Sequence, residues 1–377
     1  MSKFTINCPC LFGLESVLSG EVKRLGGANV QVSDGRVSFL GDLELVAKAN
    51  LWLRTAERVQ IVLGAFRATT FEELFQGVLS LPLEEFIGPT DAFPVKGWSL
   101  NSKLHSVPDC QSIIKKAAVN RLSQVYGIQW FRETGPVHQL QFSINKDKVI
   151  ILLDTSGAGL HKRGYRPAAN AAPIKETLAA GMLDLVRIYP DTQFFDPFCG
   201  SGTILIEAAL KALNIAPGIK RTFACEKWSV MPKQAFKLAR QEALDVIRRD
   251  APFHATGTDL DPAAVEVCRE NVRKAGVSAR VTVDCMDVRK FRLPEGRVTV
   301  VTNPPYGERI LDVHQARELY RAMGQVLVPR EDLRLGIITP EEAFETYFGH
   351  RSFKRRKLYN GMIKCQLYLY GTGVSNK

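Results

Sequence analysis

The octapeptide Asp-Pro-Phe-Cys-Gly-Ser-Gly-Thr at 196–203 constrains the fold more than any other stretch of the chain. A short apolar segment at 193–195 predicts a strand before it, and the apolar pattern over 204–213 predicts a helix directly after it. Gly200 and Gly202 allow the backbone a positive φ and allow a ligand to approach closely. Strand, glycine loop and helix in this order form the first unit of a Rossmann-like crevice.

The same loop lacks the residues of two common nucleotide-binding motifs. A P-loop needs a lysine after its last glycine, and a dinucleotide fingerprint needs a third glycine; both are missing here. The shorter loop opens with Asp196, whose carboxylate favours the ammonium and sulfonium groups of S-adenosylmethionine. A glycine turn that serves only packing is the alternative.

Two further acidic residues follow strands of the expected parallel sheet. Asp259 lies near the end of a strand over 255–260 and is placed to accept both hydroxyls of a ribose, and Asp287 follows a strand over 280–283 and is placed to accept from an adenine amino group. Each aspartate alone could be a turn residue, and Asp261 is expected to cap a helix. The carboxyl ends of parallel strands meet at one edge, which favours a shared site. The candidate cofactor residues are Asp196, Phe198, Gly200, Gly202, Thr203, Asp259, Leu260, Asp287 and Asn303.

The tetrapeptide Asn303-Pro304-Pro305-Tyr306 ends the apolar run over 298–302. The prolines bias Asn303 towards an extended conformation, so its side chain and the Pro304 carbonyl present two acceptors together. Two acceptors for an amino group beside an aromatic ring suit methylation of a nucleobase amine. We therefore take Asn303, Pro304 and Tyr306 as catalytic candidates; a simple strand-ending turn is the alternative.

Composition limits the cellular setting and the partners. The chain has 377 residues, 45% of them hydrophobic, and no apolar run approaches the length of a membrane span. The first residues lack a signal peptide's apolar region, and the eight cysteines show no zinc-like spacing, so we expect a cytoplasmic protein without metal. Lys and Arg give a net charge of +11, which suits a polyanion such as a nucleic acid. The densest basic run is 350–357.

The chain divides into three expected units. Residues 1–65 follow the order β-α-β-β-α-β of a ferredoxin-like domain. Residues 66–156 form an α+β module whose long helix over 108–126 exposes Lys115, Lys116 and Arg121; it could bind RNA or serve as a spacer. A glycine-rich basic linker opens the third unit, 157–377, in which strands and helices alternate as in a doubly wound sheet. The interval between Gly202 and Asp259 is expected to hold a strand-like segment at 223–226 and an insertion over the active-site side, with Glu226 a cofactor contact or one half of an ion pair.

Several short sequence motifs together resemble those of the THUMP-domain class I RNA methyltransferases. The chain is similar to the bacterial group that makes N2-methylguanosine in large-subunit ribosomal RNA, the RlmL N-terminal-half type. Phrases that carry the resemblance are 161–166, 172–178, 196–203, 223–228, 257–261, 303–309 and 357–361. The resemblance implies a Rossmann-like methyltransferase domain preceded by α+β ferredoxin-like and THUMP domains, with S-adenosylmethionine as methyl donor and 23S ribosomal RNA as partner. The candidate RNA-binding residues are Lys115, Lys116, Arg121, Arg163, Arg309, Lys354, Arg355 and Arg356.

Two other functions stay open. Asn-Pro-Pro-Tyr also occurs in adenine-N6 DNA methylases, so the choice of guanine over adenine rests on the resemblance. The chain could also be a non-catalytic RNA-binding assembly factor with a vestigial cofactor fold, against which the intact Asp196 loop and Asn303 motif argue. The sequence does not predict an oligomeric state.

Overall fold

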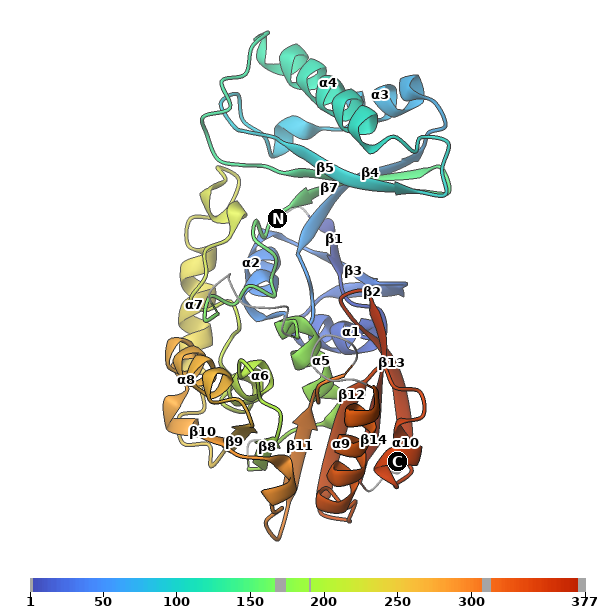
Figure 1. Ribbon diagram of the computed structural model, residues 1–377. Helices are drawn as coiled ribbons and strands as arrows, with labels where there is room; N and C mark the ends of the chain where they lie inside the picture. Colours follow the sequence, from blue (N-terminus) through green and yellow to red (C-terminus); the bar gives the residue numbers. More distant parts are fainter. Residues whose placement is uncertain (1–2, 167–173, 190, 307–312, 372–377) are drawn as a thin grey trace.

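A computed structural model describes residues 3–166, 174–189, 191–306 and 313–371. Two seven-stranded sheets organise these residues, one in the N-terminal part and one in the C-terminal part (Figure 1). The expected helix and strand order is largely present, and the fold is mixed α/β as predicted.

The first unit has the predicted ferredoxin-like arrangement, with strand order β2-β3-β1-β4. Its elements are β1 (Phe4–Pro9), α1 (Glu15–Arg24), β2 (Ala28–Ser33), β3 (Arg36–Gly41), α2 (Leu43–Trp52) and β4 (Gln60–Arg67). Asp42 caps α2, because its side chain accepts from the backbone N–H of Leu45 at 2.9 Å.

The second unit continues the same sheet. Its elements are α3 (Phe71–Leu79), β5 (Val95–Leu100), α4 (Val107–Tyr126), β6 (Leu140–Asn145) and β7 (Lys148–Asp154). β4 pairs with β1 on one side and with β7 on the other, so the full order is β2-β3-β1-β4-β7-β6-β5. The boundary expected at residue 65 falls inside β4, and the two units share that strand.

The C-terminal sheet has the order β10-β9-β8-β11-β12-β14-β13, and its strand pairs are parallel except for β12–β14 and β14–β13, which are antiparallel. Its strands are β8 (Gln193–Asp196), β9 (His254–Asp259), β10 (Val281–Cys285), β11 (Val298–Thr302), β12 (Leu333–Thr339), β13 (Lys354–Asn360) and β14 (Ile363–Tyr370). The described helices of this part are α5 (Glu176–Val186), α6 (Thr203–Ala212), α7 (Ala235–Asp245), α8 (Pro262–Ala275), α9 (Val313–Val326) and α10 (Phe344–Phe348).

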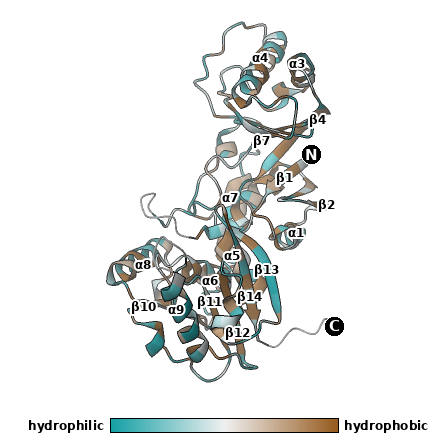
Figure 2. Cartoon of the chain, turned by 45° about the vertical axis from the view of Figure 1, so that its right-hand side comes forward, coloured by the Kyte–Doolittle hydropathy of each residue, from teal (hydrophilic) through white to brown (hydrophobic). Residues whose placement is uncertain are grey.

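Hydrophobic cores lie on both faces of this second sheet. Val301 packs in the core formed with α5, α6 and α8, whereas its neighbour Val300 packs in the core formed with α9 and α10. All five residues of β11 are buried, which explains why that strand is a continuous apolar and β-branched run. In Figure 2 the central strands are accordingly hydrophobic, while β13 at the sheet edge is hydrophilic.

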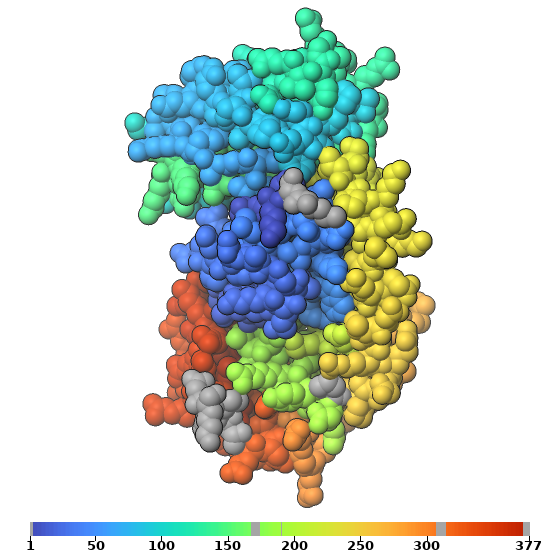
Figure 3. Space-filling view, turned by 180° about the vertical axis from the view of Figure 1, so that it is seen from behind, coloured from blue at the N-terminus to red at the C-terminus, as the bar shows by residue number. Residues whose placement is uncertain are grey.

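One expectation about the connecting segments needs correction. Residues 224–227 form a 3₁₀ turn, not a strand, because the Glu226 side chain accepts from the backbone N–H of Phe223 and from Arg240. The insertion that follows packs against α2 and the N-terminal core. Figure 3 shows this segment, in yellow, lying along the N-terminal part. Within it, Trp228 stacks on His138 with ring centroids 4.4 Å apart.

Candidate active site

The four predicted acidic and amide side chains stand at or just after the ends of neighbouring strands. Asp196 ends β8 and pairs in register with Gly257 of β9, while Asp259 ends β9 beside Cys285 of β10. β11, which leads into Asn303, lies on the other side of β8. The parallel sheet thus brings the cofactor loop and the Asn-Pro-Pro-Tyr motif to one edge, where the switch point of a doubly wound sheet binds ligands.

The loop after β8 turns tightly because of its glycines. Gly200 and Gly202 have φ of +49° and +81°, and a Cβ at Gly202 would lie 2.5 Å from Cys268 Sγ. A Cβ at Gly200 would meet no atom within 4 Å, so the loop is open at that point. Thr203 begins α6, is buried, and accepts a hydrogen bond from Arg166 Nη1 at 3.2 Å.

Asp196 is buried at the centre of this edge. Its Oδ1 accepts from Thr302 Oγ1 at 2.7 Å and from the backbone N–H of Phe198 at 3.2 Å. Burial raises the pKa of Asp196 to about 7, and the Thr302 hydroxyl partly offsets that effect. A cation bound beside this carboxyl would favour its ionised form, which is what an ammonium or sulfonium group provides.

Asp259 is half-buried and shapes the loop. Its two oxygens accept from the backbone N–H groups of Gly200 at 2.9 Å and Asp261 at 3.0 Å. A carboxylate has about four lone-pair sites, so capacity for ribose hydroxyls is left. Asp261 caps α8 as predicted, and Leu260 between them is 68% exposed.

Asp287 lies in the loop after β10. It caps the short 3₁₀ turn over Val288–Lys290, where its Oδ1 accepts from the backbone N–H of Arg289 and its Oδ2 pairs with the Arg289 guanidinium, both at 2.9 Å. The Arg289 N–H and guanidinium hold the pKa of Asp287 below its ordinary value. The Asp287 side chain is therefore ionised, and its contacts with Arg289 hold it in place.

Asn303 carries the most unusual feature of the site. Its Oδ1 is buried and has no hydrogen-bond partner among the residues that the structure describes. Such an acceptor is costly to bury unless a ligand satisfies it. Pro304 is buried next to it, and Tyr306 is half-buried with its hydroxyl accepting from Asn360 Nδ2 at 2.8 Å. The orphaned oxygen, the open glycine loop and the buried carboxyl fit an S-adenosylmethionine and an amine to be methylated.

The predicted RNA-binding residues differ in how exposed and how paired their side chains are. Lys354, Arg355 and Arg356 are exposed along β13, at the edge of the sheet. Lys115 and Arg121 are exposed only in part and pair with Glu133 and Glu84.

Lys116, on the outer side of α4, is exposed. Arg309 lies outside the described residues.

The prediction that Arg163 binds RNA needs correction. It is only 4% exposed, donates to the backbone oxygens of Leu160 and Arg54, and lies 3.5 Å from Glu207. Its guanidinium joins the N-terminal and C-terminal parts and is not available to RNA. The basic linker composition gave no sign of this, because Glu207 and Arg54 are distant in sequence.

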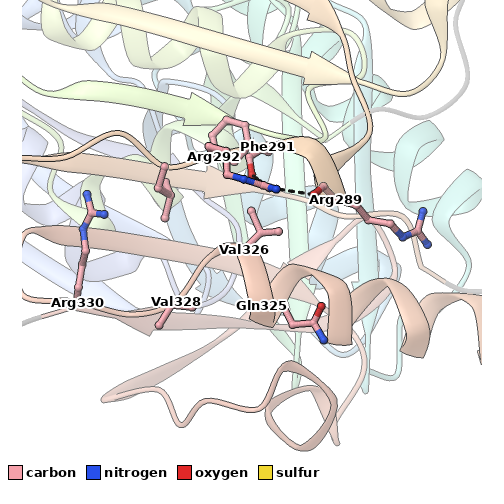
Figure 4. A pocket seen from close by; sticks show the side chains of 8 residues that line it. Arg289, Phe291, Arg292, Gln325, Val326, Val328 and Arg330 are labelled. Carbon is pink, nitrogen blue, oxygen red and sulfur yellow. Dashed lines mark hydrogen bonds between the residues drawn. The ribbon is translucent and has the colours of Figure 1, made fainter.

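A pocket of about 460 Å³ lies apart from the strand ends (Figure 4). It is lined by residues that follow β10, such as Arg289 and Arg292, and by residues at and after the end of α9, such as Val326 and Arg330. Arg289 belongs to the same turn as Asp287, but none of the predicted catalytic or cofactor residues lines this pocket. The pocket is therefore separate from the predicted site.

Over the described ranges, no group of three or more His, Cys, Asp or Glu side chains is arranged to hold a metal ion. In those same ranges, no helix has the length and apolarity to cross a bilayer.

Asn360 is a site residue that sequence reasoning missed. It belongs to the phrase Lys-Leu-Tyr-Asn-Gly at 357–361, but its partner Tyr306 is 54 positions away. The sequence shows only that the amide of Asn360 precedes the turn residue Gly361, and this pattern does not indicate a contact with Tyr306.

The chain is similar to known proteins along its whole described length. Family models match three consecutive segments: the RlmL ferredoxin-like domain over 5–60, the THUMP domain over 68–154, and the RMKL-like methyltransferase domain over 163–368. YpsC of Bacillus subtilis, described as a candidate RNA methyltransferase, is 41% identical over 99% of this chain and 97% of its own length. The ribosomal RNA large subunit methyltransferase K/L of Psychromonas ingrahamii is 33% identical over 96% of this chain. The chain spans only 49% of that longer relative.

Two solved structures are similar over nearly their whole length. SMU.472, described as a candidate methyltransferase complexed with S-adenosylhomocysteine, is 40% identical with a TM-score of 0.94 and full coverage of both chains. A Listeria monocytogenes protein described as a candidate N6-adenine-specific DNA methylase is 46% identical with a TM-score of 0.93, covering 99% of this chain and 97% of that one.

Proposed function

The chain belongs to the RMKL-like methyltransferase family, and on that premise we propose that it methylates the exocyclic N2 amine of a guanosine in 23S ribosomal RNA. S-adenosylmethionine is the methyl donor of this family, in keeping with the S-adenosylhomocysteine complex of SMU.472. The domain set and the basic edge strand support RNA as the substrate class.

The observation that carries the proposal is the unpartnered Oδ1 of Asn303. It follows Thr302, whose hydroxyl binds Asp196 of the cofactor loop. A buried acceptor beside the cofactor loop calls for a donor from the substrate, and an exocyclic amine has two N–H donors.

Bound S-adenosylmethionine supplies an electrophilic methyl group on sulfur. The protein's task is to prepare the amine, whose lone pair is delocalised into the base. Acceptors at Asn303 Oδ1 and the Pro304 carbonyl would hold the two amine hydrogens and leave the lone pair free to point at the methyl carbon. Positioning of this kind is worth up to roughly 7–11 kcal/mol of the barrier.

Tyr306 would stack on the target base once that base leaves its helix. The ring lies two residues after the Pro304 carbonyl, so one short segment provides both the acceptors and the stacking surface. Stacking of a base on an aromatic ring contributes about 1–3 kcal/mol.

The basic strand β13 supports binding of a polyanion near this segment. Lys354, Arg356 and Lys357 are exposed on the edge strand, and its last residue, Asn360, contacts Tyr306. Phosphate contacts there would place a nucleotide beside the Asn303 motif.

Adenine-N6 methylation of DNA is the second candidate, and one observation favours it: the Listeria relative is described in those terms. The acceptor argument applies equally to the adenine amine. The THUMP segment over 68–154 and the name of the Psychromonas relative favour ribosomal RNA.

One experiment separates the candidates. The chain is incubated with methyl-labelled S-adenosylmethionine and either unmodified large-subunit ribosomal RNA or double-stranded DNA, and the products are digested and identified by mass spectrometry. We expect N2-methylguanosine from the RNA. Methyladenine from either substrate overturns the choice of base, and a chain that binds no cofactor supports the assembly-factor alternative.

A further inference from the structure

The hydrogen bond between Asn360 and Tyr306 joins two parts of the C-terminal domain that are remote in sequence. Asn360 Nδ2 lies 2.8 Å from the Tyr306 hydroxyl oxygen, which accepts the bond. Tyr306 belongs to the segment after β11, and Asn360 is the last residue of β13 at the far edge of the sheet order. Both side chains are half-buried.

Asn360 is itself held firmly in place. It pairs with Ile363 across the hairpin that joins β13 to β14, and Gly361 makes the turn with φ of +64°. Before it, Leu358 is fully buried and pairs with Cys365. The amide donor is therefore fixed by a strand ladder on one side and by the core on the other.

The N-terminal part supports the same hairpin. The Phe12 ring packs edge-on against Tyr359, with ring centroids 6.2 Å apart. Gly13 approaches Lys357 so closely that a Cβ at Gly13 would lie 2.4 Å from the Lys357 carbonyl oxygen. The donor residue thus sits in a hairpin that two parts of the protein keep in position.

The Tyr306 hydroxyl accepts a hydrogen bond from this anchor and also lies against the Cys365 side chain. Burial raises the pKa of Tyr306 to about 12, so the phenol stays protonated at physiological pH. Tyr306 lies next to Pro305, whose fixed φ links the orientation of the ring to that of the Pro304 carbonyl. An anchored ring therefore also restrains one of the two proposed amine acceptors.

We propose that Asn360 is a positioning residue for methyl transfer, which orients the Tyr306 ring, and through it the Asn303-Pro304 acceptors, from the end of the basic strand. This inference rests on the proposed function of the Asn303 motif. Asn360 touches neither substrate nor cofactor in this account, and its effect passes through the tyrosine hydroxyl. The exposed side chains of β13 would bind RNA, and Tyr306 would stack on the target base. The hydrogen bond between Asn360 and Tyr306 connects these two binding surfaces.

The test compares Asn360→Leu, which removes the donor at similar size, with Asn360→Asp. Because the phenol is protonated, it can donate to the aspartate, so Asn360→Asp should retain most of the activity. Asn360→Leu should lower kcat by about 10- to 100-fold, the effect of a reacting group displaced by up to about 1 Å. Its affinity for S-adenosylhomocysteine and its melting temperature should match those of Met362→Ala, a control at the exposed turn of the same hairpin.

A double-mutant cycle with Tyr306→Phe shows whether the effect passes through the hydroxyl. In the Tyr306→Phe background, Asn360→Leu should cause almost no further loss. An equal loss in both backgrounds, wild-type kcat for Asn360→Leu, or a loss explained by weaker cofactor binding or a lower melting temperature would overturn the inference.

A second measurement needs no methyl transfer. The ring signal of Tyr306 in the NMR spectrum, assigned with Tyr306→Phe, should shift in Asn360→Leu and stay in place in Met362→Ala. An unchanged signal in Asn360→Leu contradicts the anchor. A wild-type chain that transfers no methyl group refutes the proposed function alone, because the ring signal still decides whether the anchor exists.

Discussion

Thr302 Oγ1 donates a hydrogen bond to Asp196 Oδ1 at 2.7 Å, and both side chains are buried. The bond joins the last residue of β11 to the first residue of the cofactor loop. The proposed amine acceptors and the proposed cofactor carboxyl are therefore parts of one connected structure, although 106 positions separate Thr302 from Asp196 in the sequence.

Thr302→Val should weaken cofactor binding. The substitution keeps the shape of the side chain but removes a hydrogen bond to a carboxylate, worth about 1.5–3 kcal/mol, or a roughly 10- to 160-fold weaker affinity. Calorimetry with S-adenosylhomocysteine measures the change. Thr299→Val is the matched control, because Thr299 is a buried threonine of the same strand whose hydroxyl bonds to Thr192 at 2.9 Å. Equal losses in the two variants would contradict a specific role for Thr302.

Cofactor affinity should rise with pH through the titration of Asp196, whose pKa burial raises to about 7. A bound cation favours the ionised carboxylate, so affinity increases up to about pH 7 and levels off above it, with a limiting slope of about tenfold per pH unit. Stability of the free protein has the opposite sign. Between about pH 4 and pH 7 the folded state keeps a proton that the unfolded state has lost, so this group's contribution to stability falls as pH rises.

The measurement is the dissociation constant of S-adenosylhomocysteine between about pH 6 and about pH 8. Asp196→Asn serves as the control, because it cannot ionise and should bind weakly without this pH dependence. A flat profile in the wild-type chain would show that Asp196 does not face the ammonium group, which is the cationic group of S-adenosylhomocysteine.

Gly202→Ala should destabilise the protein by about 2–4 kcal/mol. A Cβ at this position would lie 2.5 Å from Cys268 Sγ, and φ of +81° disfavours any L side chain. Gly127→Ala is the matched control, since it has φ of +68° and no heavy atom within 4 Å, and should cost only about 1 kcal/mol. Urea unfolding measures both, and similar values would rule out the close approach of the loop to α8.

Arg356→Ala should weaken RNA binding more than Arg355→Ala. Arg355 already pairs with Glu345, whereas Arg356 is exposed on β13 and no ion pair to another described residue engages it. Each lost phosphate contact should reduce the slope of log affinity against log salt by about 0.7 for single-stranded RNA. Filter binding across a salt series gives the slopes, and equal slopes for the two variants would contradict this reading of the edge strand.

The sequence predicted those features that depend on local pattern. Short apolar runs followed by Asp196, Asp259 or Asn303 suffice to place these residues at strand ends, because parallel strands end at a common edge. Features that depend on contacts between distant segments were missed or misjudged. Arg163 looked like a basic linker residue, but it bonds to the Arg54 carbonyl 109 positions away and is buried. The hydrogen bond between Asn360 and Tyr306 was missed for the same reason, because the two residues are 54 positions apart.

The most direct test of the central claim is single-turnover methylation of large-subunit ribosomal RNA by Asn303→Ala. The variant removes the unpartnered Oδ1 and leaves the Asp196 loop intact. We predict that the rate of N2-methylguanosine formation falls by at least about 100-fold. We also predict that S-adenosylhomocysteine binds with nearly unchanged affinity. Undiminished methylation by Asn303→Ala would contradict the assignment of Asn303 as the amine acceptor.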